Sequence, residues 1–192
     1  MILPIVAYGS PVLRMLSKDI TPEYPDLDKL LSDMWETMYN SNGVGLAAPQ
    51  VNKPVRIFVM DSEQIFENQE DDEMEDYPDG PGIKQAFINP HIVETAGDEW
   101  SYNEGCLSIP KIREDIMRVE SVTLNYVDEQ FVPHTKTFNG ISARIILHEY
   151  DHLEGKLFID YIKPLKRTLM KRKLDDISKG KVNVDYRMIF VK

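Results

Sequence analysis

The chain has 192 residues, 42% of them hydrophobic, and a formal net charge of −10. This length suits one globular domain with its own core, and the acidic charge excludes a nucleic-acid-binding footprint, for DNA or RNA, over the whole surface. No apolar run approaches the roughly 18 residues of a membrane span. The single cysteine, Cys106, excludes an internal disulfide framework and fits a reducing compartment, so we expect a cytoplasmic protein.

Helical periodicity marks the first long element of the chain. Residues 10–17 are expected to form a short helix, and residues 26–43 an amphipathic one. In the second segment the apolar side chains recur every three or four residues, as one face of a helix requires. They are Leu27, Leu30, Leu31, Met34, Trp35 and Met38. Asp26 is a suitable N-cap for this helix, and Gly43 a suitable end.

Three later segments predict β-structure. Residues 55–60 and 86–93 are short apolar runs typical of buried strands, and Pro90 indicates an edge or a bulge in the second. Residues 121–138 alternate between apolar and polar side chains around an Asp-Glu pair, which predicts a hairpin. Between the first two strands, residues 61–82 are dominated by Asp and Glu. A solvated loop is the favoured interpretation of this acidic insertion, because a calcium loop would need a regular spacing that is missing.

Two helices are predicted towards the C-terminus, at 140–153 and 163–180. Strands precede helices without βαβ alternation, which favours an α+β fold of mostly antiparallel sheets packed around the first of these helices. We expect one domain over residues 1–192. The last helix is rich in Lys and Arg, which suits either a transient ribosome contact or a solvated amphipathic surface.

The motif HEYDH in the first of these helices matches the H-E-x-x-H pattern of metal hydrolases. On a helix, residues four apart are separated by about 6 Å along the axis and face the same way, so His148 and His152 can share one metal ion. Glu149 lies beside them, within reach of a water on that metal. Ile141 and Ile145 continue the same face, which indicates a buried stripe that ends in ligands, a metal-binding helix. A surface helix with solvated histidines is the alternative.

A catalytic metal needs a third ligand, and the usual peptidase positions do not supply one. The extended zincin pattern would place a histidine where Phe158 stands, and no glutamate follows Glu154. Downstream aspartates stay open as alternatives, although Asp160 is too near on the chain for an easy return. Upstream, Cys106 follows a glycine in an apolar segment. Its thiolate with two imidazoles would leave a fourth position for water, as in catalytic sites, whereas an inert buried thiol is the alternative.

A third motif, GVGLAAPQ, follows the first long helix. Gly43 and Gly45 permit close approach of another backbone, and Gln50 offers a neutral amide donor that can stabilise an oxyanion. Taken alone, this stretch would be interpreted as a tight loop with a surface glutamine.

GVGLAAPQ, EGCLSIP and HEYDHLEG, in this order, resemble the three signature motifs of the peptide deformylases, and the resemblance extends over nearly all of the chain. The acidic insertion has no match in the family's core. The resemblance implies that Cys106, His148 and His152 hold the metal. In this family the metal is usually Fe(II), and Zn, Ni or Co can also occupy the site. The resemblance also implies that Glu149 is the general acid/base.

The same resemblance implies a substrate site. Gln50 and the backbone N–H of Leu107 match the family's oxyanion donors. The residues expected to contact the peptide are Gly43, Val44, Gly45, Glu104, Gly105 and Ile145. Glu104 is also expected to pair with Arg118, and Arg144 is expected either to face the peptide or to be solvated.

The implied reaction removes the formyl group from the N-terminal formylmethionine of nascent polypeptides. A metal hydroxide attacks the formyl carbon, Glu149 carries the proton to the leaving amine, and formate is released. Two alternatives keep the histidines. A zinc-dependent peptidase lacks its third ligand in the usual downstream places, and a non-catalytic metal-stabilised binding protein would need neither Glu149 nor Gln50.

Overall fold

A five-stranded sheet organises the chain, whose computed structural model describes residues 1–67 and 82–191. The strand order is β2-β3-β4-β5-β6, and all neighbours are antiparallel. The bounds are β2 Gly45–Ala47, β3 Ile57–Asp61, β4 Lys84–Cys106, β5 Ile109–Val127 and β6 Pro133–Asn139. The expected mixed fold with antiparallel sheet is therefore confirmed.

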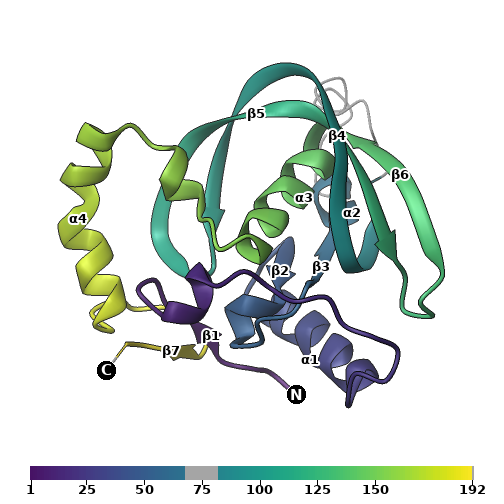
Figure 1. The fold of residues 1–192 in the computed structure, drawn as a ribbon. Coiled ribbons are helices and arrows are strands. Elements are labelled where there is room, and N and C mark those ends of the chain that lie inside the picture. Colours follow the sequence, from purple (N-terminus) through teal and green to yellow (C-terminus); the bar gives the residue numbers. More distant parts are fainter. Residues whose placement is uncertain (68–81, 192) are drawn as a thin grey trace.

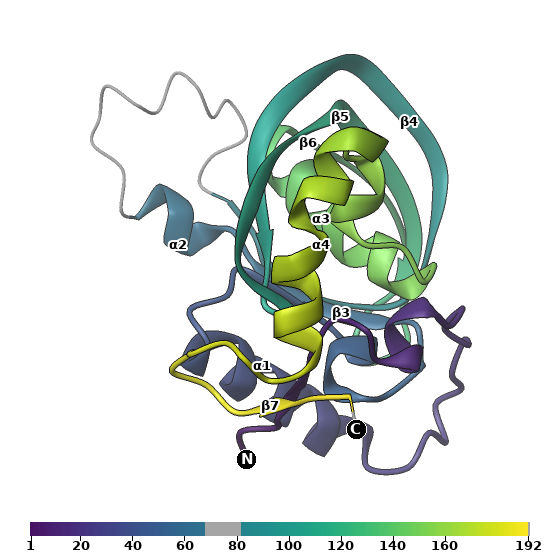
Figure 2. The same ribbon diagram turned by 90° about the vertical axis from the view of Figure 1, so that its left-hand side faces the viewer.

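Helix α3 (Gly140–Leu153) contains the HEYDH motif and contacts β2, β3, β5 and β6. Figure 1 shows α3 in the middle of the ribbon, with β4, β5 and β6 curving around it. The other helices are α1 (Leu27–Asn40), α2 (Glu63–Phe66) and α4 (Pro164–Ser178), with 3-10 turns η1 (Pro11–Arg14), η2 (Ala48–Val51) and η4 (Phe158–Tyr161). Figure 2 shows α4 on the outside of the molecule.

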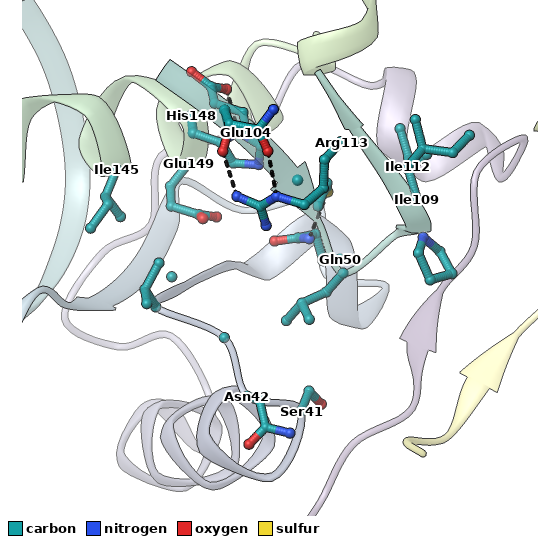
Figure 3. A pocket seen from close by; sticks show the side chains of 18 of the residues that line it. Ser41, Asn42, Gln50, Glu104, Ile109, Ile112, Arg113, Ile145, His148 and Glu149 are labelled. Atoms are coloured by element: carbon teal, nitrogen blue, oxygen red, sulfur yellow. Dashed lines mark hydrogen bonds and ion pairs between the residues drawn. The ribbon is translucent and has the colours of Figure 1, made fainter. Parts of the chain in front are cut away.

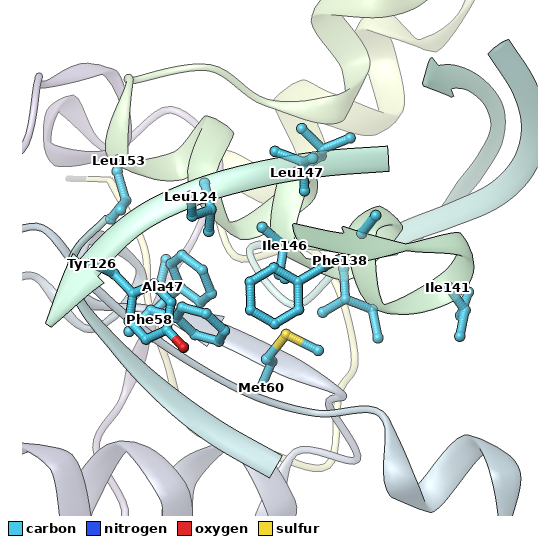
Figure 4. Close-up of a cluster of buried hydrophobic side chains, with 14 of the residues drawn as sticks. Ala47, Phe58, Met60, Leu124, Tyr126, Phe138, Ile141, Ile146, Leu147 and Leu153 are labelled. Carbon is cyan, nitrogen blue, oxygen red and sulfur yellow. The ribbon is translucent and has the colours of Figure 1, made fainter. Parts of the chain in front are cut away.

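Alternation along β3 explains why helices cover both of its faces. Phe58 and Met60 belong to the cluster that contains the buried side chains of α3, whereas Ile57 and Val59 belong to the cluster beneath α1. Successive side chains of a strand point to opposite faces, so β3 is covered by α3 on one face and α1 on the other. Figure 4 shows the first cluster, in which Phe58, Met60 and Ile146 lie together.

The predicted helix at 26–43 is present as α1, with Asp26 in the N-cap position but without a side-chain cap bond. The predicted helix at 10–17 is wrong in extent, because only the 3-10 turn η1 forms, with Pro11 in its first turn. The bulge expected at Pro90 is confirmed by a register shift between Ile88 and His91.

Two strand features were not predicted. β4 and β5 run as one long hairpin through residues 94–120, in which most of β4 between residues 94 and 103 is exposed on both faces, so that its apolar alternation is weak. A short parallel pair also joins β1 (Ile5–Val6) to β7 (Met188–Ile189), so a segment near the N-terminus lies beside one near the C-terminus. Such a pairing leaves no local signal in the sequence, because its partners are far apart along the chain.

The acidic insertion is only partly described. Its first residues form the end of β3 and helix α2, in which Phe66 is buried in the core rather than solvated. The rest of the predicted loop, residues 68–81, lies outside the described residues. None of the helices in the two described ranges has the length and apolar character needed to cross a membrane.

Candidate active site

A cavity of about 520 Å³ lies between the end of α1, β2, the closed end of the β4–β5 hairpin and α3. Figure 3 shows Gln50, His148 and Glu149 gathered at this cavity, with Ile145 on the same helix. The sequence-predicted residues that line it are Gly43, Val44, Gly45, Gln50, Glu104, Gly105, Cys106, Leu107, Ile145, His148 and Glu149. His152 does not line the cavity but lies beside Cys106.

Cys106, His148 and His152 form a cluster whose ligand atoms all lie within 4.8 Å of one another. Within residues 1–67 and 82–191 it is the only such group of three. Ligands about 2.0–2.3 Å from a tetrahedral ion are roughly 3.5 Å apart, and Cys106 Sγ lies 3.3 Å from His152 Nε2. One thiolate and two imidazoles therefore fit a divalent metal in both type and spacing.

His148 is oriented by a buried carboxylate. Its Nδ1 hydrogen-bonds Glu104 Oε2 at 2.9 Å, which leaves Nε2 free to face Cys106. A carboxylate behind a metal-binding histidine fixes the ring and its tautomer. Burial alone would raise the pKa of Glu104, but hydrogen bonds from His148 and Arg118 hold that pKa well below its ordinary value. The expected Glu104–Arg118 ion pair is thus present, at 2.7 Å.

The ion pair extends into a network that the sequence did not predict. Arg118 also donates to Asp151 Oδ2 at 2.7 Å, and Tyr161 donates to Asp151 Oδ1 at 3.0 Å. Asp151 is on α3, next to His152, so the network links β4, β5 and α3 behind the cluster. Its only signal in the sequence would have been the helical spacing of Asp151 relative to His148.

Arg144 is neither solvated nor free to bind a peptide through its full guanidinium. Its side chain is 2% exposed and donates to Glu104 Oε1, the Ile116 carbonyl and the Trp100 carbonyl. The guanidinium also lies 4.5 Å from the centroid of the Trp100 ring. The solvated alternative for Arg144 was wrong, because bonds to carbonyls and a carboxylate offset the cost of burying its charge. Arg144 does line the cavity, so a contact with the peptide stays a prediction.

Gln50 is buried and held in one orientation. The backbone N–H of Ala47 donates to Gln50 Oε1 at 2.9 Å, so the amide NH₂ faces the cysteine turn. Gln50 Nε2 lies 3.5 Å from Cys106 Sγ and 3.3 Å from Ser108 Oγ. An anchored amide donor at the cavity is preorganised to meet developing negative charge.

Glu149 is 4% exposed, and its Oε2 has no hydrogen-bond partner among the described residues. Burial raises the pKa of Glu149 to about 7. A Cβ at Gly45 would lie 2.8 Å from Glu149 Cδ. Position 45 on β2 must therefore be glycine to leave room for the carboxyl group. The structure thus places this carboxyl group against β2, in the wall of the cavity.

Asp160, the open alternative for a third ligand, is engaged elsewhere. Its carboxylate accepts hydrogen bonds from both terminal nitrogens of Arg14, one of them at 3.1 Å.

One segment near the C-terminus that lines the cavity was not predicted from the sequence. Val184, Asp185 and Tyr186, from the segment before β7, line the same cavity. Alternation of apolar and polar residues over 182–190 was the available signal for an extended segment.

Comparison with known proteins agrees with this geometry. Residues 2–168 match the family model described as polypeptide deformylase. The chain is 52% identical over 190 residues to a peptide deformylase of Christiangramia forsetii, covering 99% of this chain and 96% of that protein. It is 53% identical over 190 residues to a peptide deformylase of Flavobacterium johnsoniae, with the same coverage.

Solved structures give the same answer. The crystal structure of a peptide deformylase from Legionella pneumophila matches with a TM-score of 0.77 and 34% identity, covering 94% of this chain and 98% of that one. A peptide deformylase from Ehrlichia chaffeensis matches with a TM-score of 0.81 and 31% identity, covering 94% and 99%. The chain therefore belongs to the polypeptide deformylase family of enzymes.

Proposed function

We propose that this enzyme removes the formyl group from the N-terminal formylmethionine of newly made polypeptides and releases formate. The observation that carries the proposal is the convergence of Cys106, His148, Glu149 and Gln50 at one cavity, with His152 beside Cys106, in a chain of this family. The three ligands would hold one divalent ion, Fe(II) in the cell, with Zn, Ni or Co able to replace it.

Metal chemistry would enter at a single point. A divalent ion at such a site lowers the pKa of bound water towards about 7, which makes hydroxide available at neutral pH. In this chain Cys106, His148 and His152 supply the ligands, and Glu104 orients His148. Helix α3 would then be the central metal-binding helix of the fold.

Glu149 would move the proton. Its Oε2 is buried and unpaired within the described part of the chain, so a proton on it can be exchanged with substrate atoms rather than with a structural partner. Glu149 would accept the proton of the attacking water and return it to the leaving amine nitrogen. General acid–base catalysis of this kind contributes about 10²–10⁴ in rate.

The oxyanion would be met by two donors from different elements. Gln50 Nε2 is held towards the turn by its anchored carbonyl oxygen, and Leu107 offers its backbone N–H from that turn. Preorganised donors stabilise charge that develops in the transition state and need not reorganise during the reaction.

The peptide would bind as an added strand. β2 lies at the edge of the five-stranded sheet and lines the cavity with Gly45, preceded by Gly43 and Val44. An edge strand offers unpaired backbone groups, so affinity would not depend on the peptide's sequence. Gly105 is placed to add a backbone contact, as is the main chain of Glu104, whose carboxylate is already committed. Ile145 and Leu107 would contact the methionine side chain.

The peptidase alternative is less well supported. Asp160 is bound to Arg14, and the third donor near the histidines is a cysteine from upstream. A non-catalytic metal protein would have no use for an unpaired buried Glu149. Three further expectations stay predictions. They are a single domain over residues 1–192 with an acidic insertion, a cytoplasmic location, and a ribosome contact through the basic helix.

The proposal is tested by purifying the protein without oxygen, measuring bound metal, and assaying formate release from formyl-Met-Ala-Ser. We expect about one divalent ion per chain and release that stops on chelation and returns with Fe(II). A protein that holds the ion but never releases formate would contradict the proposal.

A further inference from the structure

We propose that Tyr186 is a positioning residue for deformylation, which acts by holding the turn that presents the Leu107 N–H. The inference rests on the proposed function. The family model ends at residue 168, so Tyr186 belongs to a C-terminal segment beyond the part that the family model describes. Its hydroxyl donates to the Leu107 carbonyl at 2.8 Å.

The turn needs outside support. Cys106 pairs with Ile109, so Leu107 and Ser108 form a two-residue connection between β4 and β5. Two-residue hairpins favour turns with a positive φ, usually at Gly or Asn. Leu107 and Ser108 are neither residue type, and neither adopts a positive φ.

The ladder behind the turn is also interrupted. The register jumps from Gly105 opposite Arg113 to Cys106 opposite Ile109, so three residues of β5 bulge out next to the turn. One of them, Lys111, has a φ of +64°. A bulge disrupts the local ladder, so strand pairing alone holds this turn weakly.

Contacts from both ends of the chain replace that support. Near the N-terminus, the Tyr8 N–H donates to the Ser108 carbonyl at 2.8 Å. From the C-terminus, Tyr186 holds the adjacent carbonyl of Leu107. The two successive carbonyls of the turn are therefore both bonded, which fixes the peptide planes on either side of Ser108 and limits rotation at Leu107.

The segment that carries Tyr186 is itself anchored. Ile5 and Ala7 donate their N–H groups to the carbonyls of Arg187 and Ile189 at 2.9 and 2.8 Å, as β1 pairs with β7. Residues 181–190 alternate strictly between exposed and half-buried, with Tyr186 on the inward face and packed against the cluster beneath α1. Figure 1 shows β7 beside β1 near the N-terminus.

Tyr186→Phe removes the hydroxyl and keeps the ring. On the metal-loaded enzyme with formyl-Met-Ala-Ser, we expect kcat to fall about 3- to 10-fold, which corresponds to the loss of one net hydrogen bond. KM should stay within about twofold of the wild-type value because substrate contacts are kept. Bound metal should stay at the wild-type value. Tyr126→Phe is the matched control, because Tyr126 is buried away from the cavity and its hydroxyl accepts from Gln85.

A second measurement does not depend on activity. Amide hydrogen exchange over residues 104–112 should be faster in Tyr186→Phe than in the wild type, while Tyr126→Phe should leave this segment unchanged. If wild-type protein releases no formate, the proposed function fails, yet the exchange still decides whether Tyr186 orders the turn. Unchanged kcat with unchanged exchange would overturn the inference, and so would a loss of kcat matched by an equal loss in Tyr126→Phe.

Discussion

Glu149 has the surroundings of a working carboxyl group rather than of a structural one. Buried carboxylates that only support a fold are paired and hydrogen-bonded, as Glu104 is with Arg118 and His148. Glu149 is as deeply buried as Glu104, but one of its oxygens has no partner in the described residues. The contrast between two neighbouring glutamates supports different tasks for them.

Glu149→Gln should keep the metal ligands and the packing while removing the proton carrier. We expect the metal-loaded variant to lose about 10²–10⁴ in kcat. Glu99→Gln, at an exposed position on β4, should leave kcat unchanged and serves as the control. Turnover of the metal-loaded Glu149→Gln protein near the wild-type rate would show that another group carries the proton.

Gly45 and Gly43 allow a graded test of the crowding beside Glu149. A Cβ at Gly45 would overlap the buried Glu149 carboxyl group, which cannot easily retreat. A Cβ at Gly43 would lie 2.9 Å from Leu107 Cδ1, the movable end of a half-buried side chain. Gly45→Ala should therefore lower kcat far more than Gly43→Ala. Overpacking should also destabilise the Gly45→Ala variant by about 1–3 kcal/mol. Equal kcat losses in the two variants would contradict this assignment.

The elements around the site are joined by charge as well as by apolar packing. Arg118 on β5 bonds Glu104 on β4 and Asp151 on α3, and its side chain is 4% exposed. By contrast, Arg14 on η1 pairs with Asp160 on η4 with its side chain 44% exposed. The ion pairs of Arg118 are therefore buried from solvent, whereas the Arg14–Asp160 pair is exposed to it.

Removing each arginine should therefore have different costs. Arg118→Met leaves buried carboxylates without their partner and should lower the free energy of unfolding by about 3–5 kcal/mol. Arg14→Met removes a solvent-screened pair and should cost about 0–1 kcal/mol. Denaturant unfolding at equal metal loading measures both. A cost below about 1 kcal/mol for Arg118→Met would mean that the network does not tie the elements together.

Periodic elements were predictable, and irregular ones were not. The apolar spacing of α1 and α3 is visible in the sequence because each helix buries one face. Most of β4 between residues 94 and 103 is exposed on both faces, so its pairing with β5 leaves no alternation to detect. The solvated alternative for Arg144 failed because its burial depends on carbonyls supplied by distant residues, whereas arginine is usually exposed.

Across the whole molecule, the candidate metal-binding cluster was more predictable than the cavity wall. Cys106, His148 and His152 stand out because few residue types bind metal, and the structure brings them together. Tyr186 has no such chemical signature. Its contact with Leu107 depends on the path of the last residues across the molecule, which only the pairing of β7 with β1 determines.

The most direct test of the central claim compares three substrates with the metal-loaded enzyme, with products identified by mass: formyl-Met-Ala-Ser, acetyl-Met-Ala-Ser and an unblocked peptide. One extra methyl in a packed site costs about 1–3 kcal/mol, and misplacing the carbonyl relative to Gln50 and Leu107 adds to that cost. We therefore predict formate release from the first, far slower deacetylation of the second, and no internal cleavage of the third. Cleavage of internal peptide bonds, with the formyl group left attached, would contradict the account and favour a peptidase.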